Sequence, residues 1–502
     1  MRRLFTLLFI GITAIAGYAT DYNVPITVTI NGVTSEQHAV ISVNEVDGRY
    51  DITLNNFMLQ SADANIGVGN VELRGIKPYQ DGNATLLIAA DQVTITDGND
   101  PAVTTWLASI LPPVNVLLRG KIEGEHLRCC LDIDLTESLG QKIEVGIGGG
   151  YQLPNQSFES WHTSTGTYTE PNGWHSFESA TGTMAMLAGH HIEKSGDAHS
   201  GAASARIFAS SIIGIIANGT MTTGRMNAGA ISATDPANNA YLDMTMTDVD
   251  GNGDPYYMPL YSRPDSVAVW VKFAQGTPNS EHPYATISAV ITDGTYYQDP
   301  EDKEYTNVVA KAGYNQIATT DGQWVRIAAP FMYTDATASP QAILITISTN
   351  ADPGQGSDKD EVLVDDIQLI YNANVSCLKI KGHDVPDFRA DRSTYEMQLD
   401  EAVAASDVEA VVNGRATHTV KHVEVTDGYY LCTVSAIGAD MSATTSYTVN
   451  VKSSAAGIKG IKTATNLTVL YFTLDGRRAE ALVPGRIYIC HQADGTVTKV
   501  CP

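Results

Sequence analysis

Strand-length runs of alternating apolar residues, separated by turn residues, fill most of this 502-residue chain. The pattern is densest between residues 151 and 371, a block that opens with Leu153–Trp161 and closes with Val362–Tyr371. In the closing run, the carboxylates Asp365 and Asp366 interrupt the alternation, which indicates a bulge or a bound cation. The chain is therefore predicted to be all-β, with a large antiparallel sandwich at its centre.

Length and charge narrow the classes of protein further. A chain of 502 residues is too long for one core, so two to four domains are expected. The formal net charge is −25. Because so acidic a surface repels phosphate backbones and anionic lipid headgroups, the sequence argues against nucleic acid and peripheral membrane binding. It favours neutral or cationic ligands and divalent cations.

The first 19 residues have the pattern of a secretory signal peptide. Arg2 and Arg3 precede an apolar run over residues 4–16, and the small residues Gly17 and Ala19 predict cleavage after Ala19. The apolar run is short for a membrane span, and no later stretch approaches that length. The chain is therefore expected to be exported.

Residues 23–135 hold strand-like runs joined by hairpin-type turns such as Asp47-Gly48. Their number fits an up-and-down barrel. Gly67–Ile76 and Leu118–Gly124 resemble the calycin-like barrel domains of exported Bacteroidetes proteins. That resemblance implies a barrel whose interior either holds an apolar ligand or is filled by side chains. The glycine-rich residues 136–150 are predicted to be a flexible linker.

Several motifs occur in a fixed order in residues 151–372. They are Leu153–Trp161, Gly173-Trp174, Gly196–Arg206, Tyr261–Lys272, Gln323–Ile327, Pro330–Tyr333 and Leu363–Leu369. Together they resemble the carbohydrate metabolism domain of Bacteroidetes proteins and, more broadly, jelly-roll carbohydrate-binding modules. The resemblance implies a two-sheet jelly roll associated with carbohydrate, without specifying a reaction.

Two smaller parts follow the central block. Residues 374–453, with Leu378–Gly382 and Thr444–Val451, are similar to the cadherin-like, immunoglobulin-type sandwiches of exported bacterial proteins. Residues 457–502 resemble the C-terminal sorting domains of the type IX secretion route, although the ending Cys501-Pro502 departs from that pattern. A plain accessory β domain is the alternative for the last part.

Sugar recognition needs flat apolar faces for the ring and planar polar groups for its hydroxyls. Aromatic residues in turn-rich stretches of the central block are the predicted stacking platforms. They are Trp161, Trp174, Tyr256, Tyr257, Tyr296 and Tyr297. Trp270 and Trp324 lie in alternating strands and are expected in the core.

Two structural calcium sites are predicted. The first is the run Asp248–Asp254, in which Asp248, Asp250, Asn252 and Asp254 supply oxygens as in the first half of an EF-hand loop. The match is partial, because the position of the bidentate glutamate holds Pro259. The second combines Glu159 with Asp365 and Asp366, where clustered carboxylates would repel without a cation. A solvated acidic turn is the alternative for the first site.

No catalytic residue is assigned from the sequence. A glycoside hydrolase needs two carboxylates at a defined separation, which the sequence does not give. The carboxylates considered for that role are Glu159, Glu170, Asp254 and Asp265. His190, His191, Glu193 and His199 form a weaker zinc pattern.

The sequence therefore predicts an exported glycan-binding protein whose jelly roll stacks aromatic rings on a polysaccharide or glycoconjugate. The alternatives are a glycoside hydrolase on the same sandwich and a structural or adhesive surface protein with protein partners. Its location would be periplasmic, on the outer surface or extracellular in a Gram-negative cell.

Overall fold

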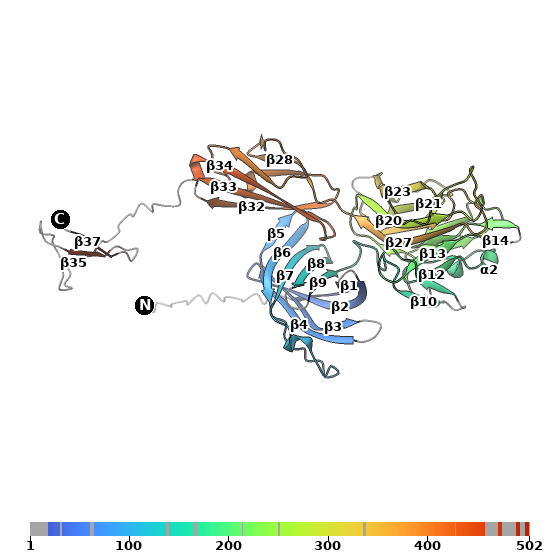
Figure 1. Cartoon of the computed structure of the whole chain (residues 1–502), viewed down its shortest axis with the longest axis horizontal. Coiled ribbons are helices and arrows are strands. Elements are labelled where there is room, and N and C mark those ends of the chain that lie inside the picture. Colours follow the sequence, from blue (N-terminus) through green and yellow to red (C-terminus); the bar gives the residue numbers. More distant parts are fainter. Residues whose placement is uncertain are drawn as a thin grey trace, which may run out of the picture. The chain divides into compact units, whose positions relative to one another are not determined.

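The chain folds almost entirely into β-strands, as predicted (Figure 1). Its two compact units are Met1–Cys377 with Ala410–Val420 and Ser435–Ser446, and Leu378–Glu409 with Lys421–Val434 and Tyr447–Pro502. A computed structural model describes residues 19–30, 33–60, 65–136, 140–163, 168–212, 214–248, 251–334, 338–426, 428–456, 470–473, 488–491 and 497–500. The predicted signal peptide lies outside these ranges except for Ala19.

The N-terminal part is a single nine-stranded antiparallel sheet. In spatial order its strands are β4 (Asn65–Ile76), β3 (Arg49–Gln60), β2 (Val33–Val46), β1 (Ala19–Ile30), β9 (Gln141–Ile147), β8 (His126–Leu135), β7 (Val114–Glu123), β6 (Ala84–Val93) and β5 (Pro78–Asp81). The 3₁₀ turn η1 (Leu107–Ser109) follows β6, and bridges Gly67–Trp106 and Asn70–Thr96 fasten β4 to this segment.

Alternation along these strands builds the core of the barrel. In β1, Ile26 and Val28 are buried while Thr27 and Thr29 face outward, and β7 buries Val116 and Leu118 in the same way. These inward side chains belong to one apolar cluster that draws on β1 to β4 and β6 to β9. A cluster filled from so many strands agrees with the alternative of a packed interior.

The predicted linker 136–150 is wrong in its second half. Residues 141–147 form β9, which pairs with β8 on one side and with β1 on the other. Val145 and Ile147 are buried in the barrel core, and Ile143 packs against it. The period-two spacing of these three residues was the signal, and the neighbouring glycines concealed it.

The central block is a sandwich of two sheets. The first contains β12 (Ile192–Ser195), β13 (Ser204–Phe208), β27 (Glu361–Ile370), β20 (Ser266–Ala274) and β24 (Val325–Pro330). The second contains β16 (Thr220–Thr222), β26 (Ala342–Ser348), β21 (Ala285–Thr292), β23 (Val308–Ile317) and β25 (Met332–Tyr333), with β19 (Met258–Pro259) paired to β26. One apolar core joins the two sheets.

Alternation again decides which residues form that core. Val267, Val269 and Val271 of β20 point inward, and Ile345 and Ile347 of β26 meet them from the other sheet. The predicted interruption near the acidic pair is confirmed, because the register of β20 against β27 shifts between Ala268 and Trp270. Asp366 adopts a positive φ of 44° at this point, as a bulged residue does.

Small elements cover the outward face of the second sheet. The three-stranded sheet β17 (Arg225–Ala228), β18 (Asn238–Leu242) and β22 (Tyr297–Asp299) lies over it, and a second apolar cluster fills the space between them. Other short elements border the same face or the sandwich rim. They are hairpin β10 (Trp161–Thr163) with β11 (Thr169–Pro171), hairpin β14 (Ser210–Ile212) with β15 (Ile215–Ala217), η2 (Phe177–Ser179) and α2 (Ala185–Ala188).

The C-terminal part carries three further sheets. They are β29 (His383–Asp384), β28 (Val375–Ile380) and β31 (Val408–Val412); β30 (Thr394–Gln398), β34 (Thr444–Lys452), β33 (Tyr429–Gly438) and β32 (Thr417–Thr426); and β35 (Leu470–Thr473), β36 (Tyr488–His491) and β37 (Val497–Val500). Two 3₁₀ turns, η3 (Ala405–Asp407) and η4 (Ser454–Ala456), complete it. The immunoglobulin-type and sorting-domain resemblances stay predictions.

The helices of the described ranges are short turns. Among them there is none with the length and apolar character that a bilayer-crossing helix requires.

Candidate functional site

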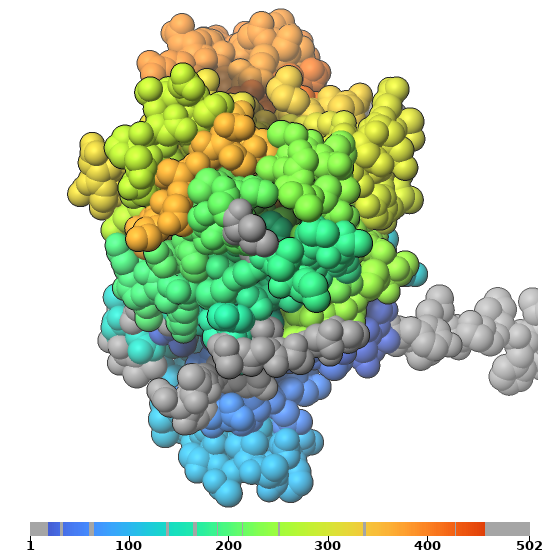
Figure 2. Space-filling model, turned by 90° about the vertical axis from the view of Figure 1, so that its right-hand side faces the viewer, coloured from blue at the N-terminus to red at the C-terminus, as the bar shows by residue number. Residues whose placement is uncertain are grey.

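A cavity of about 590 Å³ opens on the outward face of the second sheet of the sandwich. A hollow is visible there among the green residues in the space-filling view (Figure 2). Its floor comes from β21 and β26, whose outward residues Thr286, Ser288, Thr346 and Ser348 line the cavity. The inward neighbours of these residues are core isoleucines, so strand alternation itself supplies a hydroxyl-rich floor.

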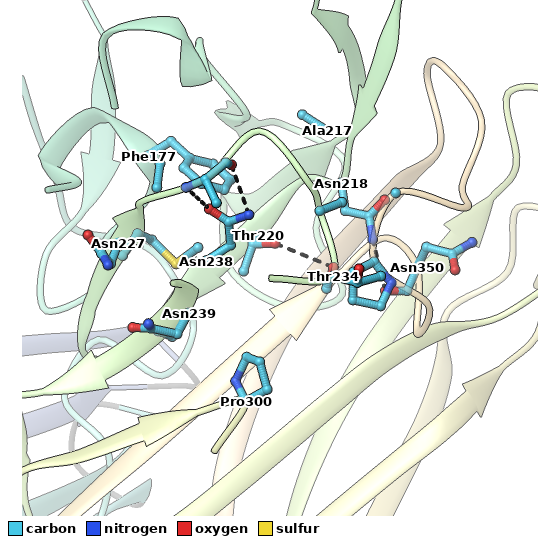
Figure 3. Close-up of a pocket in the computed structure, with 18 of the residues that line it drawn as sticks. Phe177, Ala217, Asn218, Thr220, Asn227, Thr234, Asn238, Asn239, Pro300 and Asn350 are labelled. Atoms are coloured by element: carbon cyan, nitrogen blue, oxygen red, sulfur yellow. Dashed lines mark hydrogen bonds between the residues drawn. The ribbon is translucent and has the colours of Figure 1, made fainter. Parts of the chain in front are cut away.

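Five asparagine side chains surround this floor (Figure 3). They are Asn218, Asn227, Asn238, Asn239 and Asn350. Most of their amide groups bond to nearby backbone, which fixes the loops. Two buried amide oxygens, Oδ1 of Asn218 and Oδ1 of Asn239, have no hydrogen-bond partner. A buried acceptor without a donor costs free energy, but these two oxygens are shielded by the surrounding protein and are not exposed on the cavity surface.

Apolar side chains form the walls and the rim. Phe177, Met226 and Pro300 line the cavity, and exposed side chains border its opening. Leu187 is 45% exposed and Ile231 is 67% exposed. Large apolar residues gathered at an opening, rather than scattered, mark a place where a partner or ligand makes contact.

The cavity carries little charge. Asp299 is the carboxylate among its lining residues, and its Oδ2 accepts a hydrogen bond of 2.5 Å from Ser288 Oγ. A glycosidase needs two carboxylates facing one bond. The four carboxylates considered for hydrolysis, Glu159, Glu170, Asp254 and Asp265, are absent from the lining.

Three of the predicted aromatic platforms are wrong, because their rings are buried. Trp174 is fully buried in the core, where it packs on Phe158. Tyr256 is buried against His175, and Tyr297 is buried in the cluster under β17–β18–β22. These rings lie in loop-rich sequence, but the loops fold back over the sheets and cover them.

The other predicted platforms do not line the cavity either. Trp161 packs partly on the sandwich core and donates from Nε1 to Phe158 O at 2.5 Å. Tyr257 packs on the cluster beneath β18 and β22. Tyr296 is 47% exposed and lies beside Tyr241, with ring centroids 5.7 Å apart.

Trp270 and Trp324, expected in the core, are instead only half-buried. Trp270 lies in phase with Lys272, opposite to the three inward valines of β20, so the alternation already placed it outside. The His199 ring stacks on Trp270 with centroids 3.9 Å apart, and Lys272 Nζ lies 5.1 Å from the Trp324 ring. Both rings are thus partly covered by other side chains.

The carboxylates of the predicted cation site, Glu159, Asp365 and Asp366, accept hydrogen bonds from nearby N–H groups, and a cation there stays a prediction. Glu159 Oε1 accepts from the backbone of Ala202 and Ala203 at 2.8 and 3.0 Å. Asp365 Oδ2 accepts from the His199 backbone at 2.7 Å, and Asp366 Oδ2 lies 2.5 Å from His199 Nδ1. Burial raises the pKa of Asp365 to about 6 despite these bonds.

In the EF-hand-like run, oxygens of Asn252 and Asp254 accept hydrogen bonds from neighbouring N–H groups. Asp254 Oδ2 accepts from Gly173 N at 2.5 Å and from Asn252 Nδ2 at 2.7 Å, while Asn252 Oδ1 accepts from Asp254 N at 3.0 Å. Asp250 lies outside the described residues. Asp248 turns inward, away from this arrangement. A structural calcium ion at this run stays a prediction.

The weaker zinc pattern is also dispersed. His190 Nδ1 lies 3.5 Å from Glu178 Oε1, and His191 Nδ1 lies 2.8 Å from Phe208 O. His199 is engaged with Asp366. In the described part of the chain, these histidines share no common ligand position.

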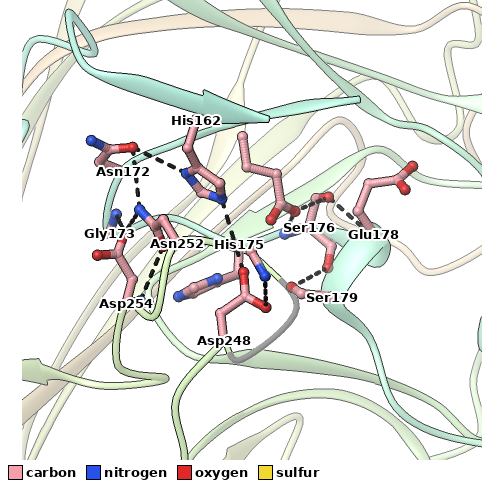
Figure 4. A network of polar contacts seen from close by, with 12 residues as sticks. His162, Asn172, Gly173, His175, Ser176, Glu178, Ser179, Asp248, Asn252 and Asp254 are labelled. Atoms are coloured by element: carbon pink, nitrogen blue, oxygen red, sulfur yellow. Dashed lines mark hydrogen bonds and ion pairs between the residues drawn. The ribbon is translucent and has the colours of Figure 1, made fainter. Parts of the chain in front are cut away.

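A different group gathers beside the sandwich, on hairpin β10–β11 and the turn at Asp248 (Figure 4). One ligand atom from each of His162, Glu170 and Asp248 lies within 4.8 Å of the others. Burial raises the pKa of Glu170 to about 7. Burial also lowers the pKa of the neighbouring His175 to about 4, so this imidazole is neutral near pH 7.

Sequence reasoning missed this group as a unit. His162 was not considered, Glu170 was considered only as an acid, and Asp248 was assigned to a calcium loop. The signal was the hairpin itself, because residues 162 and 170 become cross-strand partners when β10 pairs with β11. The third member comes from a turn more than 70 residues later, which no spacing rule connects.

Comparison with known proteins supports the fold of the N-terminal sheet. Residues 18–149 match the family described as Calycin-like beta-barrel domain. This part of the chain is therefore similar to calycin-like barrels. The match includes β9, in agreement with the pairing of β9 between β1 and β8. No curated protein sequence matches the chain.

Two solved structures match the chain at low similarity. One, of carbohydrate-binding modules from the beta-sandwich superfamily, is 13% identical, covers 69% of this chain and 98% of that chain, and has a TM-score of 0.21. The other holds the M60 catalytic domain with the CBM51-1 and CBM51-2 domains of Clostridium perfringens ZmpB. It is 9% identical, covers 93% of this chain and 42% of that chain, and has a TM-score of 0.14.

Proposed function

We propose that the chain is an exported glycan-binding protein, and that the cavity on the sandwich holds the ligand. The observation that carries this proposal is the lining, in which hydroxyl and amide groups alternate with apolar surface and charge is nearly absent. A sugar ring presents the same combination, with C–H faces and hydroxyl edges. The chain's net charge of −25 further favours a neutral ligand over an anionic one.

Individual groups support the assignment. Five asparagines line the cavity, and their amide groups hold the surrounding loops in place, for example through Asn227 Nδ2 to Ala237 O and Asn239 Nδ2 to Pro236 O. Thr286 and Ser348 offer hydroxyls on the floor, and the exposed Ile231 offers apolar surface at the rim. The volume of about 590 Å³ suits a ligand of a few sugar rings. Stacking on tryptophan or tyrosine, as predicted from the sequence, is not part of this proposal.

The ligand class and location follow from the same reasoning. An apolar rim beside a hydroxyl-rich floor favours a glycoconjugate or a polysaccharide segment over a free, fully solvated monosaccharide. The signal-peptide pattern supports export to the periplasm, the outer surface or the medium. Protein partners at the cell surface remain a prediction of the adhesive alternative.

A glycan array probed with the full mature chain tests the proposal. Binding to a defined glycan is expected, and the variant Asn239→Ala should weaken it because the loop that Asn239 Nδ2 holds at Pro236 O, beside the cavity, loses that bond. Asn279→Ala is the matched control, since that asparagine lies outside the cavity. Binding that is equal in both variants would contradict the assigned site.

The same assay separates the alternatives. Release of reducing sugar from a bound glycan would make the protein a glycoside hydrolase. If the protein binds no glycan but captures one protein partner, the result would favour the alternative of an adhesive surface protein. Binding without release is the result expected here, because one carboxylate, Asp299, lines the cavity.

A further inference from the structure

We propose that His162, Glu170 and Asp248 bind a divalent metal ion of the zinc class. The ion would fasten hairpin β10–β11 to the turn that begins at Asp248. This inference does not depend on glycan binding, because none of the three residues lines the cavity.

The hairpin places the first two ligands on one face. His162 pairs directly with Glu170 across β10 and β11, and directly opposed residues project to the same side with Cβ atoms about 5 Å apart. Asp248 completes the group from the facing turn, with its Oδ2 3.9 Å from His162 Nε2. Ligand atoms around tetrahedral zinc lie roughly 3.4 Å apart, given bonds of about 2.0–2.1 Å. A small rotation of the side chains would bring the ligand atoms from 3.9 Å to the separation that zinc requires.

The three atoms that face one another all lack hydrogen-bond partners. His162 Nε2, Glu170 Oε2 and Asp248 Oδ2 are each buried and unsatisfied. Glu170 is 0% exposed and Asp248 is 2% exposed. Burying two such carboxylate oxygens beside each other is costly unless a cation compensates them. A single cation bound at their shared point would provide a partner for all three atoms.

The remaining atoms of the ligands are already held by the protein. Glu170 Oε1 accepts from Ser176 N at 2.7 Å. Asp248 Oδ1 accepts from Tyr256 Oη at 3.1 Å and from Gly251 N at 3.2 Å. Each carboxylate thus uses one oxygen for the fold and directs the other to the shared point. This division is the one expected of monodentate metal ligands with supporting hydrogen bonds.

The imidazole is oriented in the same manner. His162 Nδ1 lies 3.0 Å from Asn172 Oδ1, and Asn252 Nδ2 donates to that same oxygen at 3.3 Å. Asn172 Oδ1 is therefore the acceptor, so His162 carries its proton on Nδ1. The lone pair of Nε2 then faces the two carboxylates. A histidine that binds a metal through one nitrogen commonly donates from the other in this way.

The backbone leaves room for the ion at Gly251. A methyl group on Gly251 would collide with Asp248 Oδ2 and lie 3.1 Å from His162 Nε2. The absence of a side chain keeps this position open between the two ligands.

The donor set favours zinc over calcium. One imidazole nitrogen and two carboxylate oxygens suit zinc and neighbouring transition metals, whereas calcium takes six to eight oxygens. Three protein ligands leave a fourth position for water or another donor. Two of the three ligands are fully buried, so the ion would act as a cross-link between the hairpin and the turn.

Metal content of the full mature chain tests the proposal. The protein is stripped with a chelator, incubated with zinc sulfate, desalted and analysed by mass spectrometry of the elements. One zinc per chain is expected for the wild type, with at least a hundredfold weaker binding in His162→Ala and Glu170→Gln. His282→Ala is the control, because His282 pairs with Asp352 elsewhere in the sandwich. Equal zinc content in all four proteins would overturn the proposal.

A second variant keeps the test valid if a ligand change harms folding. Gly251→Ala retains all three ligands but fills the ion's position, so zinc should be lost while the circular dichroism spectrum is retained. Gly196→Ala is its control, because a methyl group there meets nothing within 4 Å. Cobalt provides a spectroscopic measure, since four-coordinate cobalt absorbs strongly in the visible range. Zinc retention by Gly251→Ala, or binding of calcium in place of zinc, would refute the assignment.

Discussion

The barrel and the sandwich use the same alternation of residues but with different results. In the barrel, one sheet gathers the inward side chains of β1 to β4 and β6 to β9 into one apolar cluster. In the sandwich, the second sheet is covered on both faces, by the first sheet on one side and by β17–β18–β22 on the other. The outer covering is partial, and the cavity lies where it stops.

The difference shows where a binding site can arise in an all-β protein. In the barrel, the inward side chains pack on one another and stabilise the fold. A sheet with a third, incomplete layer has polar outward positions, such as Thr286 and Thr346, that are shielded from bulk water but not packed. The sandwich therefore carries the features suited to ligand binding, and the barrel carries features suited to stability.

The largest expected effect is in the barrel core. Leu118→Ala removes a fully buried side chain and should lower the free energy of unfolding of the barrel by about 2–5 kcal/mol. Glycan affinity should be unchanged, since Leu118 is far in sequence and packing from the cavity. Denaturant titration and glycan binding measure the two effects. The paired variant Ile345→Ala, beneath the cavity floor, should reduce both the free energy of unfolding and the glycan affinity. Loss of glycan binding in Leu118→Ala would contradict the assignment of the ligand site to the sandwich alone.

The next effect concerns acid stability of the sandwich. His175 is buried and neutral in the folded state, with a pKa lowered to about 4 against about 6.5 in the unfolded chain. Between these values the unfolded chain binds the proton more readily, so stability falls as the pH drops from 6.5 towards 4. The maximal loss is on the order of 3 kcal/mol.

Urea titrations at several pH values, with chelator present, measure this loss. His175→Gln should flatten the dependence over that window. His383→Gln should not, because His383 is exposed in the C-terminal part. An unchanged slope in His175→Gln would show that other groups cause the acid sensitivity.

The third-largest effect is expected when a bulky side chain fills the cavity. Thr286→Trp places an indole on the floor and should weaken glycan binding at least a hundredfold, or about 2.7 kcal/mol, without loss of fold. Thr53→Trp makes the same change on the outward face of β3 in the barrel and should leave binding unaffected. Isothermal titration with a glycan from the array measures both. Retained binding in Thr286→Trp would place the ligand elsewhere on the molecule.

The smallest effect is expected at the rim. Ile231 is 67% exposed, so Ile231→Ser removes only part of an apolar contact and should weaken binding about three- to tenfold, or roughly 1 kcal/mol. Ile110→Ser, at a 76% exposed position next to η1, is the matched control. An equal change in both variants would argue against contact between the ligand and the rim.

Local patterns were sufficient to predict the class of fold. Alternation in the strands, hairpin turns such as Asp47-Gly48 and the interruption at Asp365 all led to the observed sheets. The same alternation, applied consistently, would also have identified β9 and placed Trp270 on the outward face. The sequence therefore contains enough information to predict both features correctly.

The cavity and the metal-ligand group were beyond such patterns. Trp174 is in a loop and Tyr297 begins the short strand β22, and only the way these segments pack over the sheets decides that the two rings are buried. His162 and Glu170 meet across one hairpin, but Asp248 joins them through tertiary structure. Residues brought together from distant elements depend on loop conformation, which composition and spacing do not specify.

The position of β1 has a consequence for how the chain reaches its folded state. β1 is the first strand to emerge, yet its second neighbour is β9, so that Ile26 pairs with Ile147. Until β9 arrives, the edges of β1 and β8 both present unpaired backbone groups, which are prone to pair with other chains. Such long-range pairing slows folding. The two halves of the sheet, β4 to β1 and β8 to β5, are therefore joined only when residues 141–147 pair, and a fragment ending at residue 135 would carry two additional open edges and be prone to aggregate.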